Sequence, residues 1–255
     1  MDLEPTGRRA LVTGTTRGIG RAIADRLARE GCALAICARD GDELARAAED
    51  LRARGVTVHG GGRCHRRTGA RAFVADTGAA LGGLDLLVAN AGGSAGGERL
   101  ADAGAEDWRT TLDLNVVHAA VAARAAAPLM RAAGGGAMVF VASISGVRPQ
   151  PRARYAAEIH LAVALGRELG PNGIRVNALS PGSIVFPDGG WDHRRANDTE
   201  AFEQWVRDEF PLGRLGRVEE VADVACFLLS ARASWISGTN VVVDGAQNQP
   251  GMSGW

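Results

Sequence analysis

A glycine-rich turn near the N-terminus has the composition of a phosphate-binding loop. It reads Thr13-Gly14-Thr15-Thr16-Arg17-Gly18-Ile19-Gly20 and stands between a short apolar run and an amphipathic segment. Glycines there let the backbone approach a pyrophosphate, and the first turn of a helix presents free N–H groups to it. The same pattern also serves as a tight strand-to-helix turn that binds nothing. Its place in the first strand–helix unit favours a nucleotide site.

Further short motifs occur along nearly the whole chain, and together they resemble one family. The spacing Thr-Gly-x-x-x-Gly-Ile-Gly is similar to that of the short-chain dehydrogenases/reductases rather than of the longer dinucleotide-binding proteins. The other matching positions are Asn90-Ala91-Gly92, Asn115 in a Leu-Asn-Val setting, Ser143, Tyr155, Pro181-Gly182 and Asp244-Gly245. The resemblance implies a nicotinamide-dependent carbonyl or alcohol oxidoreductase.

The resemblance also implies roles for individual residues. Tyr155 is expected to be the general acid/base, Ser143 to hold the substrate oxygen, and Asn115 to support a proton relay. Tyr155 is the only tyrosine of the chain, so no neighbour can replace it. The interval of twelve residues from Ser143 to Tyr155 is one short of the commonest family spacing, which leaves Ser145 as the alternative to Ser143. The expected cofactor-binding residues are Gly14, Thr16, Arg17, Gly18, Ile19, Gly20, Arg39, Asn90, Ala91, Gly92, Pro181, Gly182 and Ile184.

The end of the second expected strand bears on which cofactor binds. An acidic side chain there would bind the ribose 2′-hydroxyl of NAD, but Ala38-Arg39 occupies the position. Arg39, together with Arg17 in the glycine-rich turn, could pair with a 2′-phosphate through charge-assisted hydrogen bonds. The alternative is that both are solvated surface arginines. We predict NADP(H) in preference to NAD(H).

The chain contains no lysine, and this removes one residue that the family uses. All 29 of its Lys and Arg positions are arginine. Where the family has Tyr-x-x-x-Lys, the segment from Tyr155 reads Tyr-Ala-Ala-Glu-Ile, which places Ile159 at the lysine position. That lysine normally holds the nicotinamide ribose and lowers the pKa of the tyrosine, which is near ~10 when unperturbed. An ionised Glu158 beside Tyr155 would raise the pKa instead. His160 lies about 100° around the helix from the lysine position, so it or an arginine is an imperfect substitute. The plainer interpretation of Glu158 and His160 is an ordinary helix surface.

Residues 60–71 interrupt the pattern with Gly, Arg, His and Cys where a helix would be expected. The family usually places an acidic residue just after the third strand to contact adenine, and our alignment puts Arg63 there. A metal site from His59, Cys64 and His65 is disfavoured because the ligand spacing is irregular, and we expect no metal. A compensated frameshift is a more specific hypothesis. Residues 61–66 can be encoded by codons that, read one base later, give Ala-Asp-Val-Val-Thr and then an acidic residue, which is close to the family pattern. The codons of the gene therefore test the frameshift hypothesis.

Residues 183–210 form a long insertion that carries five aromatic side chains: Phe186, Trp191, Phe202, Trp205 and Phe210. Long loops in compact domains are usually functional lids or else disordered. The aromatic side chains favour a lid that covers an apolar substrate pocket. The alternative is that they simply pack in the protein core. At Phe186 many relatives carry a threonine that bonds the nicotinamide amide or the phosphates.

Short apolar runs alternate with segments of helical period, and these elements position the motifs. Strands are expected at Arg9–Thr13, 33–38, 56–59, 84–89, 137–142, 175–180 and Asn240–Val243, with helices at 20–30, 43–54, 107–131, 155–169, 200–209 and Val218–Leu229. Near-continuous apolar strands that alternate with helices predict an α/β fold, a Rossmann-type doubly wound parallel sheet of about seven strands with helices on both faces. No repeat or linker divides the chain, so residues 1–255 are expected to form one domain.

Composition excludes several classes of protein. A formal net charge of zero argues against nucleic acid or an anionic membrane surface as a partner. No apolar run approaches the ~18 residues of a membrane span. Four widely spaced cysteines in a chain of this size indicate a reduced, cytoplasmic protein. Family resemblance implies a homotetramer or dimer packed through the alanine-rich helices 107–131 and 155–169. The alternative is that these helices pack on the sheet of their own chain.

The prediction is therefore an NADP(H)-dependent oxidoreductase of the short-chain dehydrogenase/reductase type. It acts on a small, fairly apolar carbonyl or alcohol substrate, with Tyr155 as acid/base and with less efficient redox chemistry because Ile159 replaces the lysine. The alternative is an enzyme of the same fold without redox chemistry, such as a dehydratase, cyclase or isomerase that uses Tyr155 and Ser143, or a non-catalytic binding or assembly partner. A protein of either alternative kind need not bind a cofactor.

Overall fold

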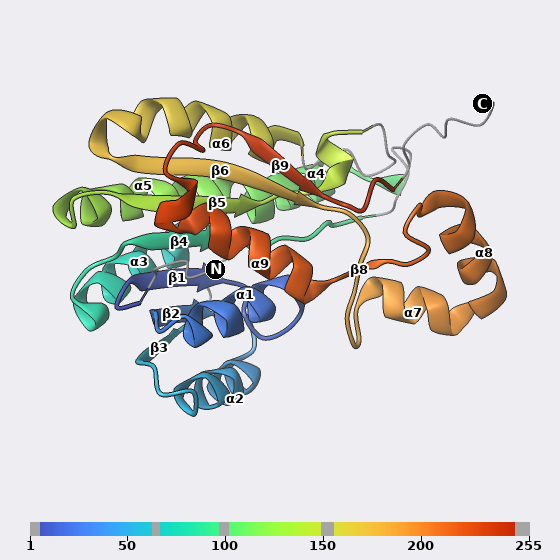
Figure 1. Cartoon of the computed structure of the whole chain (residues 1–255), viewed down its shortest axis with the longest axis horizontal. Coiled ribbons are helices and arrows are strands. Elements are labelled where there is room, and N and C mark those ends of the chain that lie inside the picture. The colour runs from blue at the N-terminus through green and yellow to red at the C-terminus, as the bar shows by residue number, and fades with distance from the viewer. Residues whose placement is uncertain (1–5, 63–66, 97–101, 149–155, 248–255) are drawn as a thin grey trace.

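Seven parallel strands form the central sheet, in the order β3-β2-β1-β4-β5-β6-β9 (Figure 1). The computed structural model describes residues 6–62, 67–96, 102–148 and 156–247. The order runs outward from β1 in both directions, so the carboxyl ends of β1 and β4 flank the point where the winding reverses. Ligands of such sheets bind at this crevice. The strands are β1 (Arg9–Thr13), β2 (Ala33–Cys37), β3 (Val58–Gly61), β4 (Leu86–Ala89), β5 (Gly136–Val141), β6 (Ile174–Pro181) and β9 (Asn240–Val243).

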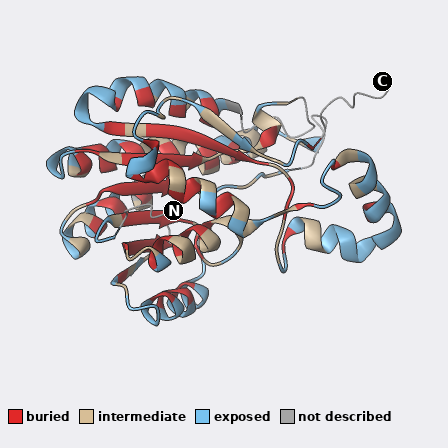
Figure 2. Cartoon of the chain, viewed as in Figure 1, coloured by how far each residue is buried: buried red, intermediate tan, exposed pale blue. Residues whose placement is uncertain are grey.

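Helices cover both faces of this sheet, as the sequence predicts. One core contains buried apolar residues of α1 (Gly18–Arg29), α2 (Gly41–Arg52) and α9 (Val218–Leu229). The other core contains those of α3 (Arg67–Leu81), α5 (His118–Ala132) and α6 (Ala156–Leu169). Figure 2 shows the strands buried between helices whose outer faces are exposed. The α/β doubly wound class is confirmed.

The strands and helices form where apolar residues are spaced so that one helix face and the strands beneath it can be buried together. In α1 the residues Ile23, Ala24, Leu27 and Ala28 are buried, which is the spacing of one helix face against the sheet. All four residues of β4 are buried, as expected for a central strand covered on both sides. Asp40 starts α2, because its side chain accepts the N–H of Glu43 at 2.8 Å.

Two stretches differ from the expected elements. The single helix expected over 107–131 is α4 (Ala105–Leu112), a π-helical turn η2 (Asp113–Val117) and α5. No helix is expected over 72–81, yet α3 covers that stretch and buries Phe73, Val74 and Thr77 with helical spacing. The glycines around it weaken the helical signal, but burial of this face stabilises the helix.

The insertion after β6 contains helices of its own. A two-stranded parallel sheet joins β7 (Ile184–Val185) to β8 (Gly216–Arg217), and α7 (Gly190–Asn197) and α8 (Thr199–Glu209) lie between them in the chain. Figure 1 shows α7 and α8 projecting beyond the carboxyl ends of the central strands. Residues 183–217, which include the expected lid insertion 183–210, are named the lid segment after that expectation.

The cysteines differ from the expectation of four reduced thiols. Cys37, at the end of β2, is disulfide-bonded, whereas Cys32 and Cys226 are buried free thiols. The expectation is therefore wrong for Cys37. None of the helices within the described ranges is long and apolar enough to cross a membrane.

Candidate active site

The glycine-rich turn is fastened to the end of β2. Gly14 and Thr15 donate their N–H groups to the carbonyl of Cys37 at 2.9 and 3.3 Å. Gly14 has φ +73° and Gly18 has φ +61°, a left-handed conformation that favours glycine. Because Arg39 follows Cys37 by two residues, these bonds bring Arg39 to the edge of the turn. Arg39 and Arg17 are both exposed.

Asn90 joins the same turn to the end of β4. Its side-chain amide donates to the carbonyls of Thr13 and Gly14 at 2.9 and 3.0 Å. The backbone N–H groups of Asn90 and Ala91 both donate to the Thr13 hydroxyl at 2.9 Å. A Cβ on Gly20 would lie 2.2 Å from the Gly14 carbonyl oxygen and 2.3 Å from the Asn90 amide nitrogen. The packing therefore requires glycine at position 20, and Thr13 is an anchor that the sequence reasoning did not single out.

This edge fits the pyrophosphate of a dinucleotide. Helix α1 begins at Gly18 with no side-chain acceptor from its N-cap residue Arg17 and no acidic residue in its first turn. No N-cap side chain therefore occupies its first N–H groups, and this positive end of the helix could bind an anion. Thr16 and Ile19 flank the turn and are half-buried. One neighbouring side chain, Phe186, restricts access to Gly18.

Asn115 lies within the π-helical turn η2 and is 3% exposed. Its amide nitrogen donates to the carbonyls of Thr111 and Gly93 at 2.6 and 2.7 Å, and its oxygen accepts the N–H of Gly93 at 3.2 Å. A Cβ on Gly92 would lie 2.5 Å from that oxygen. The π-helical turn, a feature frequent at functional sites, thus holds Asn115 against the loop that follows Asn90. The sequence pattern predicts a continuous helix here and gives no sign of the turn.

Ser143 follows β5, and its hydroxyl oxygen accepts the N–H of Ser145 at 3.1 Å. This bond opens a short 3-10 turn, Ile144–Gly146. Tyr155 lies outside the described residues, as do Arg63, Cys64 and His65. The choice between Ser143 and Ser145 as the partner of Tyr155 therefore stays a prediction.

Glu158 and His160, which flank the lysine position, are expected to lie on the surface of the helix, but the structure separates them. Glu158 is 3% exposed, and burial raises the pKa of its carboxyl well above the ordinary value. Ile159, at the lysine position, is also buried, and it packs in the core shared by α5 and α6. His160 is exposed. The interpretation as helix surface is confirmed for His160 and wrong for Glu158, because the register of α6 turns position 158 inward.

A second anchor holds the turn after β6, where Pro181 is the last residue of the strand. Gly182 donates its N–H to Val243 at 2.9 Å, and Ser183 donates its N–H to the Gln247 side chain at 2.5 Å. Arg148, five residues after Ser143, pairs with Asp244 at 2.6 Å and donates to the Gln247 carbonyl. Ile184 is buried in β7. Arg148 and Gln247 are absent from the expected site, and their link across about 100 residues leaves no local sequence signal.

Aromatic rings hold the lid segment together. The Trp191 and Trp205 rings stack at a centroid distance of 4.8 Å, and Phe210 meets Trp205 edge-on at 4.9 Å. Phe202, Phe210 and Leu215 form a small core of their own. A cavity of about 400 Å³ beside this core is lined by both apolar and arginine side chains: Val185, Arg195, Phe202, Glu203, Val206, Arg207, Gly213, Arg214, Leu215 and Arg217.

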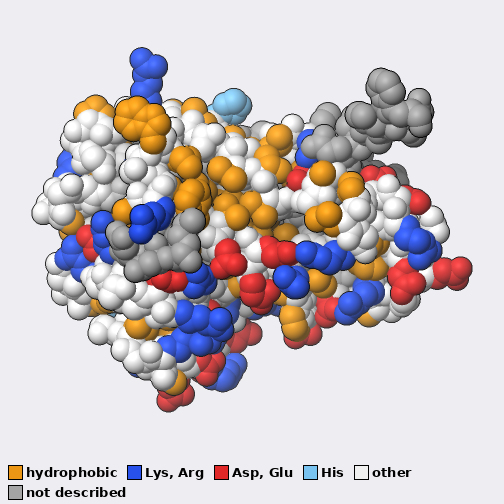
Figure 3. All heavy atoms as spheres, in the orientation of Figure 1, with side chains coloured by type: hydrophobic (Ala, Val, Ile, Leu, Met, Phe, Trp, Pro, Cys, Tyr) orange, Lys and Arg blue, Asp and Glu red, His pale blue; other side chains and the backbone are white. Residues whose placement is uncertain are grey.

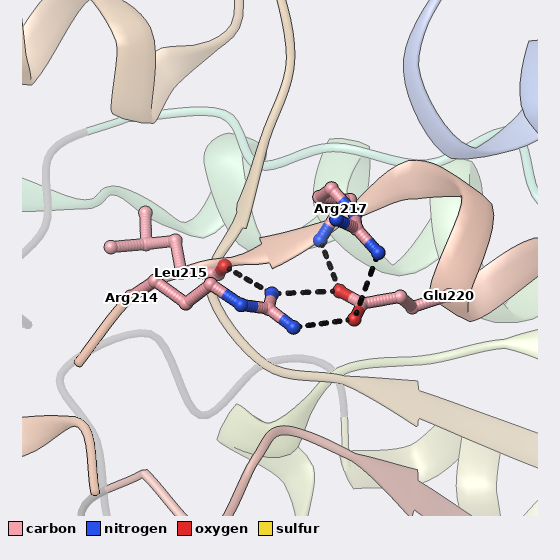
Figure 4. A network of polar contacts seen from close by, with 4 residues as sticks. All are labelled: Arg214, Leu215, Arg217 and Glu220. Atoms are coloured by element: carbon pink, nitrogen blue, oxygen red, sulfur yellow. Dashed lines mark hydrogen bonds and ion pairs between the residues drawn. The ribbon is translucent and has the colours of Figure 1, made fainter. Parts of the chain in front are cut away.

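Polar contacts fasten the far end of the lid segment to α9 (Figure 4). Glu220 accepts hydrogen bonds from the Arg214 guanidinium at 2.7 and 3.0 Å and from the Arg217 N–H at 2.8 Å. These bonds lower the pKa of the Glu220 carboxyl to about 2, and the bond from Arg214 has the largest effect. Within the described part of the chain, no group of three or more His, Cys, Asp or Glu side chains could hold a metal ion.

Comparisons with known proteins agree with this geometry. The model of the family described as "Enoyl-(Acyl carrier protein) reductase" matches residues 14–247. The chain is 36% identical over 243 residues to dehydrogenase/reductase SDR family member 4 of Pongo abelii, covering 92% of this chain and 86% of that protein.

Solved structures are similar over almost the whole chain. L-Sorbose reductase from Gluconobacter frateurii, complexed with NADPH and L-sorbose, has a TM-score of 0.89 at 32% identity and covers 98% of this chain and 100% of its own. A 7α-hydroxysteroid dehydrogenase complexed with NADH and 7-oxo glycochenodeoxycholic acid has a TM-score of 0.88 at 29% identity and covers 98% and 97%. This chain belongs to the short-chain dehydrogenase/reductase family and is a nicotinamide-dependent oxidoreductase.

Proposed function

We propose that the enzyme uses NADP(H) to interconvert a small, fairly apolar carbonyl compound and its alcohol. The observation that carries this proposal is the set of contacts joining the glycine-rich turn, Asn90 and the end of β2, with Arg39 exposed at the edge of the turn. An arginine at this position favours a 2′-phosphate over a free ribose hydroxyl. Related structures bound to NADPH or NADP support the same preference.

Residues at or after the carboxyl ends of β1, β2, β4 and β6 would hold the cofactor, and a bound nicotinamide supplies or accepts the hydride. The proposed binding residues are Gly14, Thr16, Arg17, Gly18, Ile19, Gly20, Arg39, Asn90, Ala91, Gly92, Pro181, Gly182 and Ile184.

Tyr155 would donate a proton to the carbonyl oxygen of the substrate, and the Ser143 hydroxyl would hold that oxygen by a hydrogen bond. Asn115 would keep the loop after Asn90 in place and support proton transfer. With the apolar Ile159 at the lysine position, no cation there lowers the pKa of Tyr155. An unperturbed tyrosine is protonated at neutral pH, since its pKa is near ~10. It can therefore act as an acid in reduction far better than as a base in oxidation.

We propose that the chain forms one domain. Within it, the lid segment would shape the substrate site. Its aromatic core and the apolar part of the adjoining cavity support an apolar substrate. We propose that residues 183–210 act as the substrate lid.

The first test is NADPH consumption with a panel of small apolar ketones. Tyr155→Phe should lower the turnover about 10²- to 10⁴-fold, which is the usual contribution of a general acid. Its circular dichroism and NADPH affinity should match the parent protein. Unchanged turnover in this variant would remove Tyr155 from the mechanism.

The cofactor preference has a test of its own in Arg39→Asp. A carboxylate there repels the 2′-phosphate and accepts the ribose hydroxyl, so NADPH affinity should fall at least about tenfold while NADH affinity rises. Calorimetry with both cofactors measures the change. Arg46→Asp, on the exposed face of α2, makes the same charge change away from the turn and should leave both affinities unaltered.

A non-redox enzyme of the same fold is the second candidate. The observation in its favour is the buried pair at the lysine position, apolar Ile159 and the carboxyl of Glu158 with its raised pKa. In that case substrate conversion would depend on Tyr155 and would proceed without consumption of NADPH.

We also propose a homo-oligomer located in the cytoplasm. The free thiols of Cys32 and Cys226 support a reducing compartment, whereas the disulfide-bonded Cys37 does not. Leu112 on α4 and Val163 on α6 expose apolar side chains on two of the expected contact helices. Figure 3 shows further apolar side chains gathered around β9, where Val242 is exposed. Light scattering that gives the mass of a single chain would contradict the oligomer.

A further inference from the structure

The ring of Phe186 lies between two glycines. A Cβ on Gly18, the first residue of α1, would lie 3.0 to 3.2 Å from three carbons of the ring. A Cβ on Gly189 would lie 3.0 Å from two carbons of the same ring. The ring therefore packs against backbone at both positions, and a side chain on either glycine would require the ring to shift by a few tenths of an ångström.

This position matters because Gly18 begins the helix that faces the pyrophosphate. The outward N–H groups of α1 attract a phosphate only if it can come within hydrogen-bond distance of them. An apolar ring beside Gly18 offers a phosphate no hydrogen bond and fills space next to the first residue of α1. A ring in this place and a phosphate bound at the start of α1 would therefore compete for the same space.

Phe186 is also tied to the lid segment. Gly189 donates its N–H to the Phe186 carbonyl at 3.0 Å, closing a turn that leads directly into α7. Asp188 within this turn has φ +57°, a left-handed conformation uncommon for a residue with a side chain. Its N–H is held by the Asp192 carboxylate of α7 at 3.2 Å. A backbone shift at Phe186 would therefore also move the start of α7.

We propose that Phe186 is a gate over the cofactor site, closed in this structure, which must leave Gly18 before NADPH can bind. The proposal rests on the proposed NADP(H) function. Opening swings the ring off α1 together with the start of α7, so cofactor entry and lid opening are one event.

The gate has a defined thermodynamic effect. The apparent Kd equals the intrinsic Kd divided by the fraction of molecules that are open. A ring that covers Gly18 in about nine of ten molecules weakens the apparent Kd about tenfold. Removal of the ring should restore the lost affinity chiefly through faster association, because the closed state delays entry and does not contact the bound cofactor.

The test compares NADPH binding to the parent protein, Phe186→Ala and Phe186→Leu, using calorimetry for Kd and stopped-flow tryptophan fluorescence for the rates. We expect Phe186→Ala to bind NADPH about tenfold tighter with a raised association rate, and Phe186→Leu to lie between it and the parent. Phe227→Leu is the matched control, since Phe227 lies on α9, outside the lid segment, and is half-buried against the core of α1, α2 and α9. It should leave NADPH binding unchanged and so exclude a general effect of replacing a phenylalanine ring by leucine.

Each outcome decides the matter. Equal or weaker NADPH binding by a folded Phe186→Ala overturns the gate and leaves the proposed cofactor intact if the parent binds. Binding by Phe186→Ala but not by the parent supports both. If no variant binds NADPH at millimolar concentration, the proposed function fails and the gate fails with it. Thermal unfolding of each variant verifies that the fold is retained.

Discussion

The edge around the glycine-rich turn and the lid segment lie at the same ends of the strands, yet different forces hold them. The edge consists of small residues and side chains that bond to backbone, such as Asn90, Thr13 and Asn115. The lid segment is held by aromatic rings and arginine–carboxylate pairs. Backbone-directed bonds fix distances to within tenths of an ångström, whereas stacked rings and exposed ion pairs tolerate sliding. The first region therefore has the rigidity that the proposed cofactor site needs, and the second has the weaker restraints that the proposed lid needs.

The largest effect should come from adding one methyl group to the edge. In Gly20→Ala the new Cβ meets the Gly14 carbonyl and the Asn90 amide at 2.2 and 2.3 Å. The loss should be about 3 kcal/mol of unfolding free energy, the upper part of the usual range for overpacking. Urea unfolding measures it, and NADPH binding should be lost as well. Gly41→Ala, at the start of α2, meets nothing within 4 Å and is the matched control. Equal stability of the two variants would contradict a rigid edge.

Truncation in the lid segment should have a comparable local effect and a small global one. Trp205→Ala removes contacts with Trp191, Phe202 and Phe210, each worth about 0.5–1.5 kcal/mol beyond burial. Hydrogen exchange should accelerate throughout α7 and α8 while α1 and α5 keep their protection. Trp235→Ala is the control, because that side chain is 99% exposed. Loss of protection in α1 to the same degree would show that the two regions unfold together.

The same contrast explains how far sequence reasoning reached. The seven strands and the glycine-rich turn could be predicted because their signals are local, an apolar run or a glycine spacing. Helix α3 was missed because the glycines near it hide its period. The link from Arg148 to Asp244 and Gln247 joins residues about 100 positions apart, and the inward side of Glu158 depends on how α6 packs. Contacts of this kind arise only when the chain has folded.

Glu158 in α6 and Glu220 in α9 have pKa shifts of opposite direction. Burial raises the pKa of Glu158 in α6, so folding favours its protonated form. Below the unfolded pKa, near ~4.3, both states are protonated and Glu158 costs no stability. Above it the unfolded chain ionises first, and stability falls by about 1.4 kcal/mol per pH unit until the folded pKa is reached. Glu158→Gln should therefore be more stable than the parent at about pH 8 and equal to it at about pH 4. Glu168→Gln, exposed on the same helix, should show no such pH dependence.

Glu220 should show the opposite sign and the smallest effect. Its pKa is lowered to about 2, so its stabilisation is present above the unfolded value and is lost as the pH falls toward about 2. Because the Arg214 and Glu220 side chains are 46% and 33% exposed, water and salt screen the pair. Glu220→Gln should therefore lose less than about 1 kcal/mol at neutral pH, and the loss should shrink in about 1 M NaCl. Glu219→Gln, its exposed neighbour, provides the baseline. A larger loss that resists salt would mean that the lid segment is anchored to α9 as rigidly as the glycine-rich turn is to β4, and a lid held that firmly could not open with Phe186.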